Sequence, residues 1–532
     1  MGKDLRTQAV QLKLHRYPVL DTYAWGLKNP QTFFPPLEKL FKTETVANLS
    51  NYGIRLSEEI SAIVDENTIR TTSGKILPIH RKTTSILSPF KWMRGDYGVI
   101  GLPKPETIAT EMQEKLQSQH TAAYVGAMAS IALSESGCIH FPKVYGVYVG
   151  MAAKHTIDIS DDYEDLSERR WFGDNIGKSF ELKLRDPEDG RTEFKHTRGR
   201  RPGVELGEDI GLDGITDIEA DHVDDPMSRS QELSQSVTSS ESFLHEEDDS
   251  TDTDDVFAIE SCACSEESEE DEEEEEDETD EPFAWATFSD IPVVTTVMEK
   301  CDGTFYDLIE KHHESEKHSA WVSQIVLALA YAQRNFGLTH NDLHGNNVMY
   351  VSTTNEYLYY KHSGVCYRIP TFGYLIKIID FDRAIVSVRL CGMKEPRQFV
   401  SSQFHADDEA GGQYNIEPFY DNEHPYLQPN PSFDLCRFAT SLFWDMFPEG
   451  PDYEYTHPLF EVFKQWMTQS DGSSVLFREK RDNHDRYHGF GLYKAIARYC
   501  KDSAVPRREI VKLTAFQLQS VPLGVNCLFI EN

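Results

Sequence analysis

Residues Leu338–Tyr350 read LTHNDLHGNNVMY, which places His340, Asp342 and Asn347 in the spacing H-x-D-x-x-x-x-N. The apolar residues that follow the Asn predict a strand, so the polar residues before it belong to a loop. Further along, the stretch Ile378–Asp382 reads IIDFD, an apolar run that delivers a carboxylate at its end. The two stretches together predict a polar site built from two carboxylates and one amide.

These residue types suit the chemistry of phosphoryl transfer. Such a transfer requires metal ions that neutralise a triphosphate and an oriented acceptor hydroxyl. Mg²⁺ prefers oxygen ligands and keeps several waters, so Asn347 and Asp380 fit as its protein ligands. Asp342 then fits as the base that orients the hydroxyl and takes its proton. His340 is expected to hold the backbone of the loop rather than to touch a substrate.

Both stretches resemble the protein-kinase superfamily, whose catalytic loop reads H-R-D-x-x-x-x-N and whose metal motif reads D-F-G. The wording is most similar to divergent Ser/Thr kinases of large cytoplasmic DNA viruses, such as the iridoviruses. This resemblance covers residues 46–150 and 283–500. It implies an α+β, two-lobed kinase-like fold, ATP and Mg²⁺ as cofactors, and transfer of the γ-phosphoryl group to protein hydroxyls. It also implies a location in the host-cell cytoplasm, with the virion as a further site.

The resemblance extends to the parts that hold the nucleotide and the loop. Met298 would be the gatekeeper at the end of a strand, and Glu299 and Cys301 would supply hinge groups that bind adenine. The stretch around Asp434 resembles the start of the buried helix that anchors the catalytic loop through an Asp.

The glycine-rich loop and the nucleotide lysine have several candidates. Gly53 in Asn-Tyr-Gly-Ile and Gly95 in Gly-Asp-Tyr-Gly each match part of the kinase pattern, and an ordinary turn stays open for both. If Gly53 is right, a hairpin that turns near Gly74 leads to a third strand that ends at Lys82, which would pair the α- and β-phosphates. Lys91 and Lys104 are rivals, and a plain surface lysine also stays open.

The pattern departs from the family at several positions. No acid lies near residues 122–124, where the helix Glu that pairs with the lysine is expected; Glu111 and Glu114 lie further upstream on a helix that should begin at Pro105. Asn341 replaces the Arg before the catalytic Asp, which implies activity without a phosphorylated activation segment. Asp382 replaces the Gly of D-F-G, which implies a stiffer segment because Gly alone adopts positive φ freely.

Two other functions therefore stay open. His344 and the Asp-Phe-Asp sequence also resemble aminoglycoside and choline phosphotransferases, which act on small molecules. The unclear lysine–glutamate pair keeps open a pseudokinase that serves as a binding scaffold.

Charge divides the chain into a nearly neutral body and one acidic segment. Residues 151–281 carry 45 acidic and 12 basic side chains, whereas the other 401 residues carry 44 and 40. Few apolar residues lie in this segment, so we expect disorder and a role as a solvated spacer or a docking site for basic proteins. We expect five parts: an N-terminal extension 1–45, the first part of the N-lobe 46–150, the acidic insertion 151–282, the last N-lobe strand and hinge 283–301, and the C-lobe 302–532.

The composition also bears on partners. A body so close to neutral argues against direct nucleic-acid binding. No run of 18 apolar residues exists, so no membrane span is expected. Protein substrates are the partners that the resemblance implies.

Overall fold

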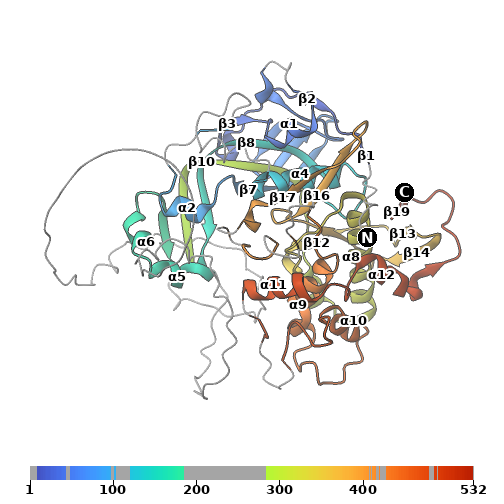
Figure 1. The fold of residues 1–532 in the computed structure, drawn as a ribbon. Coiled ribbons are helices and arrows are strands. Elements are labelled where there is room, and N and C mark those ends of the chain that lie inside the picture. The colour runs from blue at the N-terminus through green and yellow to red at the C-terminus, as the bar shows by residue number, and fades with distance from the viewer. Residues whose placement is uncertain are drawn as a thin grey trace, which may run out of the picture.

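The structure, a computed structural model, describes residues 9–43, 48–97, 101–103, 120–184, 283–405, 408, 410–414, 419, 427–478, 485–487 and 489–530. It is a mixed α+β fold. Figure 1 shows a strand-rich part above a mainly helical part, with helix α4 (Ala122–Ser134) near the place where the two meet. The expected α+β class is therefore confirmed.

A seven-stranded antiparallel sheet forms the strand-rich part and curls into a half-barrel (Figure 1). Strand β10 lies at its centre and pairs with three other strands. Its second half is rich in Val and Thr, whose β-branched side chains suit a buried, pleated surface. Six strands follow one another in the order β3 (Leu27–Gln31), β8 (Val144–Asp158), β10 (Ala284–Glu299), β7 (Ile76–Ser85), β6 (Thr68–Thr71) and β5 (Ile60–Asp65), and β9 (Glu181–Leu184) pairs with the start of β10.

The helical part is built around one long buried helix. Helix α8 (Ser315–Phe336) buries most of its residues and ends at Gly337, whose φ of 55° is the left-handed conformation of a helix C-cap. The helix before it, α7, starts with a capping box in which Thr304 and Asp307 satisfy each other's backbone N–H groups. The other helices are α7 (Phe305–Lys311), α9 (Phe433–Met446), α10 (Leu459–Trp466), α11 (Phe490–Tyr499) and α12 (Pro506–Glu509).

Smaller sheets join this helical part. The strand expected after Asn347 and the apolar strand expected before Asp380 are confirmed as β12 (Val348–Ser352) and β15 (Tyr374–Ile378), with a Tyr-rich insertion between them. The insertion itself is a hairpin that forms a four-stranded sheet with two short C-terminal strands. The remaining strands are β11 (Gly303–Thr304), β13 (Tyr357–His362), β14 (Val365–Pro370), β16 (Ile385–Leu390), β17 (Arg397–Val400), β18 (Gln517–Leu518) and β19 (Cys527–Phe529).

The N-terminal segment does not form a separate extension, in contrast to the expected unit 1–45. Strand β3 belongs to the large sheet, and β1 (Ala9–Val10) pairs with β16 in the helical part. The segment is thus shared between both parts, because its backbone supplies edge hydrogen bonds to each. The other short elements are β2 (Leu14–Arg16), β4 (Tyr52–Ile54), α1 (Pro36–Leu40), α2 (Pro89–Met93) and the 3-10 turns Tyr23–Trp25, Leu49–Asn51, Ser160–Asp162, Gly345–Asn347, Ser402–Phe404, Ile510–Lys512 and Thr514–Phe516.

The acidic insertion begins later than expected. Residues 151–184 are folded: β8 continues to Asp158, and the helices α5 (Tyr163–Ser167) and α6 (Arg170–Asn175) lead to β9. The physical reason is a second hydrophobic core, in which Phe172 and Phe180 pack against Phe288 of β10. The boundary at 151 is therefore corrected to 184, and residues 185–282 lie outside the described part. So do the expected helix start at Pro105 and the candidates Lys104, Glu111 and Glu114.

We expect a chain in which Asn-Gly replaces residues 185–282 to fold normally. Leu184 is paired with Ala284, so the two ends of the excised stretch already lie side by side as in a hairpin. Its thermal unfolding midpoint should stay within about 4 °C of the parent's, which corresponds to roughly 1 kcal/mol. A deletion of residues 155–280 is the matched comparison: it also removes the core around Phe172, so it should unfold at a much lower temperature. Equal midpoints for both deletions would contradict this assignment of the folded boundary.

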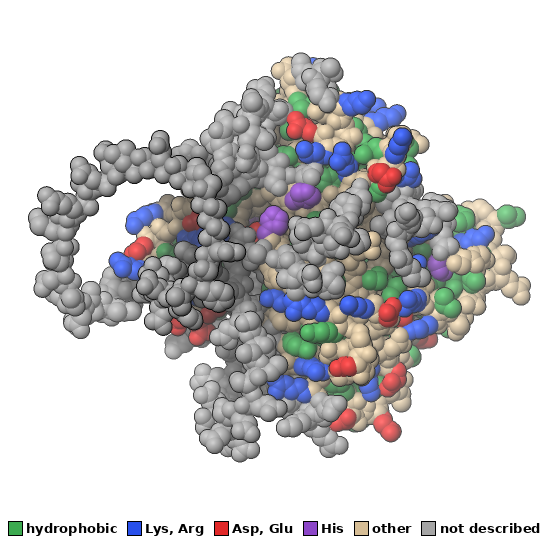
Figure 2. Space-filling view, viewed as in Figure 1, with side chains coloured by type: hydrophobic (Ala, Val, Ile, Leu, Met, Phe, Trp, Pro, Cys, Tyr) green, Lys and Arg blue, Asp and Glu red, His purple; other side chains and the backbone are tan. Residues whose placement is uncertain are grey.

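The charged side chains on the described surface fit the nearly neutral body that the composition indicates. Figure 2 shows basic and acidic side chains interspersed over the described residues of one face. None of the helices in the described ranges has both the length and the apolar composition that a bilayer crossing requires.

Candidate functional site

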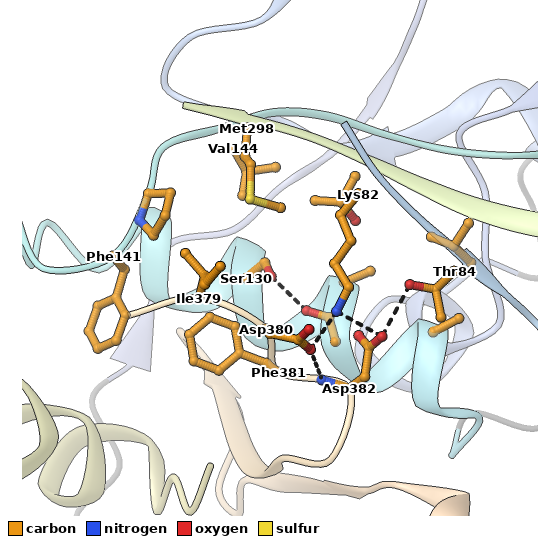
Figure 3. A pocket seen from close by; sticks show the side chains of 16 residues that line it. Lys82, Thr84, Ser130, Phe141, Val144, Met298, Ile379, Asp380, Phe381 and Asp382 are labelled. Atoms are coloured by element: carbon orange, nitrogen blue, oxygen red, sulfur yellow. Dashed lines mark hydrogen bonds and ion pairs between the residues drawn. The ribbon is translucent and has the colours of Figure 1, made fainter. Parts of the chain in front are cut away.

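A pocket lies where the large sheet, helix α4 and the residues after β15 meet (Figure 3). Its sheet wall comes from β7, β8 and β10, and its other walls come from α4 and from residues 379–382. Side chains fill most of the space between these walls. The pocket thus joins the two parts of the molecule and collects residues from distant parts of the chain.

The loop before β12 is held by a buried carboxylate. The backbone N–H groups of His340 and Asn341 both donate to the carboxylate of Asp434, each at 3.0 Å. Asp434 lies in the first turn of α9 and is fully buried. The His340 ring bonds through Nε2 to the carbonyl oxygen of Ile379 at 2.7 Å, which ties the loop to the residue before Asp380. Asp434 and His340 therefore both hold the backbone of this loop.

Asn341 is also a fixed part of this loop. Its φ is 65°, in the left-handed region that Asn tolerates better than most residues. Its Nδ2 donates to the carbonyl oxygens of Thr339 and Arg383, and its Oδ1 accepts from the hydroxyl of Tyr414 at 2.6 Å. Where the kinase pattern has an Arg, this chain has a buried amide that bonds three neighbouring residues.

Asp342 lies at the end of this turn with cationic and hydroxyl partners. The Tyr493 hydroxyl donates to Oδ1 at 2.6 Å, and Arg383 Nη1 lies 3.4 Å from Oδ2. Burial by itself would raise the pKa of Asp342, but Arg383, His344 and Arg437 outweigh it and hold that pKa below its usual range. Asp342 is therefore ionised at neutral pH.

Asn347 and Asp380 are brought together by backbone contact between their segments. The backbone N–H of Ile379 donates to the carbonyl oxygen of Asn347 at 3.0 Å. Within the described residues, the Asn347 side chain forms two hydrogen bonds, and both involve its Nδ2 atom. Nδ2 donates to the carbonyl oxygen of Asp342 at 2.9 Å and lies 3.0 Å from His344 Nε2. Burial lowers the pKa of His344 to about 4, so its ring is neutral and accepts this bond. The amide oxygen of Asn347 is left for another partner.

Lys82 lies inside β7, three residues before the strand ends, rather than at its end. Its Nζ lies 2.5 Å from Asp380 Oδ1 and 2.8 Å from Asp382 Oδ2 (Figure 3). Thr84, on the same face of the strand, donates to Asp382 Oδ2 at 3.1 Å. Burial alone would lower the pKa of Lys82, but the two carboxylates outweigh it and raise that pKa. Burial alone would raise the pKa of Asp380, but Lys82 in return outweighs it and holds that pKa low.

The segment after β15 is strained at a different residue from the one expected. Asp380 has a φ of 65°, whereas Asp382, which replaces the Gly of the kinase motif, has no positive φ. The residue at the position of the motif Gly therefore needs no left-handed conformation here. Its carboxylate contacts Lys82 and Thr84 instead.

The three hinge candidates lie at the end of β10. Met298 is buried and lines the pocket. The Glu299 carboxylate points elsewhere: it bonds Lys377 Nζ at 2.9 Å and the backbone N–H of Lys143 at 3.2 Å. Cys301 is half-buried, and burial raises the pKa of its thiol to about 12.

The structure does not bring Gly53 to this pocket. Gly53 belongs to β4, where a Cβ would press against Thr32 and the Tyr17 ring. The hairpin between β5 and β6 turns at residues 66–67, which include no glycine, whereas the expected turn at Gly74 between β6 and β7 is present. Neither rival lines this pocket: Lys91 pairs with Asp408 at 3.0 Å in the wall of a neighbouring cavity, and Gly95 lies against Asn175.

A wider cavity of about 520 Å³ adjoins the pocket and shares Lys82, Thr84 and Asp382 with it. Its remaining walls come from the end of β7 and residues 86–91 with Tyr97, from the start of α4, from residues 155–157 of β8, and from Ser402, Gln403, His405 and Asp408. Lys82 and Asp382 are therefore approachable from two sides.

Sequence reasoning missed several residues of the site. Arg383, Arg437 and Tyr493 surround Asp342, yet none belongs to a recognisable spacing. Two other residues could be recognised in the sequence because they are unusual. Gly126 is a Gly inside an apolar helix, and Asp382 is a carboxylate at the position of a motif Gly.

The chain has no match among protein-family models, and no curated protein matches it. The side chains that meet around Lys82, Asp342 and Asp380 are thus the basis for assigning a function.

Proposed function

We propose that this chain is an ATP- and Mg²⁺-dependent Ser/Thr protein kinase with a two-lobed, kinase-like fold. The observation that carries the proposal is that Lys82 and Asp380 meet in the pocket between the sheet and the helical part, while the loop of Asp342 and Asn347 is bonded to the residue before Asp380. An anchored loop Asp, an Asn five residues later, a strand-end Asp and a strand Lys are the parts that kinases use.

The placement of each part supports this assignment. Lys82 lies on the third strand of the meander β5–β6–β7, and kinases carry their nucleotide lysine on a third strand. The strand β10, which pairs with β7 and places Thr296 opposite Lys82, leads directly to the hinge candidates. The loop of Asp342 is held by Asp434 from a buried helix.

The residues also fit the proposed cofactors. A carboxylate of Asp380 and the amide oxygen of Asn347 are ligands of the kind that Mg²⁺ prefers. Lys82 offers a cation for phosphate oxygens, and Met298 and Val294 offer apolar contacts for a base. When bound, Mg²⁺ would neutralise the charge on the triphosphate.

The chain's own residues then divide the work. Asp342, ionised and held by Tyr493, accepts a hydrogen bond from the acceptor hydroxyl and takes its proton as the hydroxyl becomes acidic in the transition state. Lys82 contacts Oδ1 of Asp380, so a cation at that oxygen would compete with Lys82 for it. A nucleotide would have to displace side chains that fill the pocket.

A small-molecule phosphotransferase is the second candidate. The neutral His344 beside Asn347, together with the Asp-Phe-Asp sequence at residues 380–382, favours it. A scaffold without transfer activity is the third, and the filled pocket favours that reading. The proposed docking of basic proteins concerns residues outside the described ranges and stays a prediction.

Transfer of labelled phosphate distinguishes the three. We expect the full chain, incubated with Mg²⁺ and γ-labelled ATP, to label Ser and Thr of casein, and to stop doing so when Mg²⁺ is chelated. Label on an aminoglycoside or on choline instead would identify the second candidate. Nucleotide binding without label on any acceptor would identify the scaffold.

A further inference from the structure

Helix α4 faces the pocket without a single acidic side chain. Its thirteen residues read AAYVGAMASIALS, and Ala123, Gly126, Ala127 and Ser130 line the pocket. The nearest following acid, Glu135, bonds the backbone N–H of Ser57 and does not reach Lys82. Within the described residues, α4 therefore supplies no carboxylate to the nucleotide lysine.

Asp382 occupies the space where such a carboxylate would lie. Its Oδ2 is 2.8 Å from Lys82 Nζ and accepts from the Thr84 hydroxyl at 3.1 Å. Lys82 and Thr84 are two residues apart on β7, so both point to the same face of the sheet. One carboxylate is thus clamped by two neighbouring side chains of one strand (Figure 3).

Gly126 makes this position of Asp382 possible. A Cβ at residue 126 would overlap Asp382 Oδ1 and would lie 3.2 Å from its carboxyl carbon. Gly is unfavourable inside a helix because of its backbone freedom, so its presence in the middle of α4 calls for a close approach of this kind. Helix α4 therefore lacks an acidic side chain for Lys82 and also lacks a Cβ at residue 126, where the carboxylate of Asp382 lies.

We infer that Asp382 is the positioning residue for Lys82, in place of a carboxylate from α4, and that Gly126 provides the room for it. This inference rests on the proposed function. Lys82 bridges Asp380 and Asp382 in the structure. When Asp380 leaves to bind a cation, Asp382 still holds the lysine toward the phosphates. Because the pair needs no acid from α4, a displacement of that helix would not break it.

A double-mutant cycle between residues 126 and 382 tests this inference. Asp382→Gly should lower kcat/KM for ATP by about 10- to 100-fold, the range expected when a hydrogen bond to a charged group is lost. Gly126→Ala should cause a similar loss in the parent, because its methyl group displaces Asp382. In the Asp382→Gly background the same Gly126→Ala change should cost less than about twofold, because neighbours that share one contact are not additive.

A relocation variant provides the rescue. Gly126→Glu combined with Asp382→Gly returns a carboxylate to the same space from the helix, and we expect it to recover at least about tenfold of the lost kcat/KM. Thermal unfolding of all four variants separates loss of the contact from loss of the fold. A merely structural role would lower the unfolding midpoint without the cycle's non-additivity or the rescue.

The dependence of activity on Mg²⁺ concentration distinguishes a positioning role of Asp382 from a role as a metal ligand. Asp382→Asn should raise the KM for ATP while the half-saturating Mg²⁺ concentration stays unchanged; a shift in that concentration would make Asp382 a metal ligand and overturn the inference. Additive losses in the cycle would overturn it too. If the parent binds ATP but transfers no phosphate, the proposed function fails. The double-mutant cycle between residues 126 and 382 is then measured with the Kd for the nucleotide. A parent that binds no nucleotide would overturn both.

Discussion

Replacing Asp342 with Asn is expected to slow phosphoryl transfer by about 10²- to 10⁴-fold, the typical contribution of a positioned base. The amide keeps the size of the carboxylate and still meets the Tyr493 hydroxyl, but it takes no proton. Nucleotide affinity should change less than about threefold, because Lys82 and Asp380 are untouched. Measurement of kcat with labelled ATP, beside nucleotide binding by fluorescence, checks both halves of the prediction.

A surface carboxylate serves as the control for Asp342. Asp502 forms an exposed ion pair with Arg508 at 2.7 Å, and such pairs contribute little. Asp502→Asn should therefore leave transfer and stability unchanged. Full transfer activity in Asp342→Asn would show that the base is another residue, and loss of nucleotide binding together with transfer would show a structural role instead.

Replacing Asp434 with Ala should cost roughly 2–6 kcal/mol of unfolding free energy and nearly all transfer activity. The substitution leaves the buried N–H groups of His340 and Asn341 without their acceptor, at about 1–3 kcal/mol each. The same loop carries Asp342 and Asn347, so its loosening also disperses the site. Urea unfolding, with the activity measured in parallel, gives both numbers.

Asp434→Asn is the matched variant for this prediction. An amide oxygen at the position of Oδ1 can still accept from both N–H groups. Burial raises the pKa of Asp434, which means that the charged form is disfavoured there and that a neutral side chain loses little. We expect Asn to retain most of the stability that Ala loses. Equal losses would show that the charge, rather than the acceptor geometry, holds the loop.

Patterns confined to short segments were the most predictable features. The loop at Leu338–Tyr350 and the strand that delivers Asp380 follow from spacings of a few residues, whereas the anchoring role of Asp434 was expected from the kinase resemblance. The turn at Gly74 was also predictable, since it depends on local backbone preference. Lys82 was one of three lysines considered from the sequence, and only the tertiary structure shows that it lies beside Asp380.

Features that depend on distant contacts were mispredicted. Gly53 matched a short motif but lies on β4, and the acidic composition after residue 151 hid the core around Phe172. In both cases packing against another segment outweighed the local signal. Composition is an average over a whole segment, whereas a few aromatic side chains suffice to pack part of that segment against a neighbouring strand.

The sequence by itself determined which side chains are candidates for the site. The spacing within two short motifs identifies Asp342, Asn347 and Asp380, because a short segment of backbone sets the order and distance of such residues. Only the tertiary structure decided what each one faces. Lys82 and Asp380 are 298 residues apart in the chain, and their contact depends on how the sheet, α4 and the residues after β15 pack together. The same packing decided that Lys82 is paired by Asp382, since Gly126 makes room for that carboxylate only when α4 lies against the residues after β15.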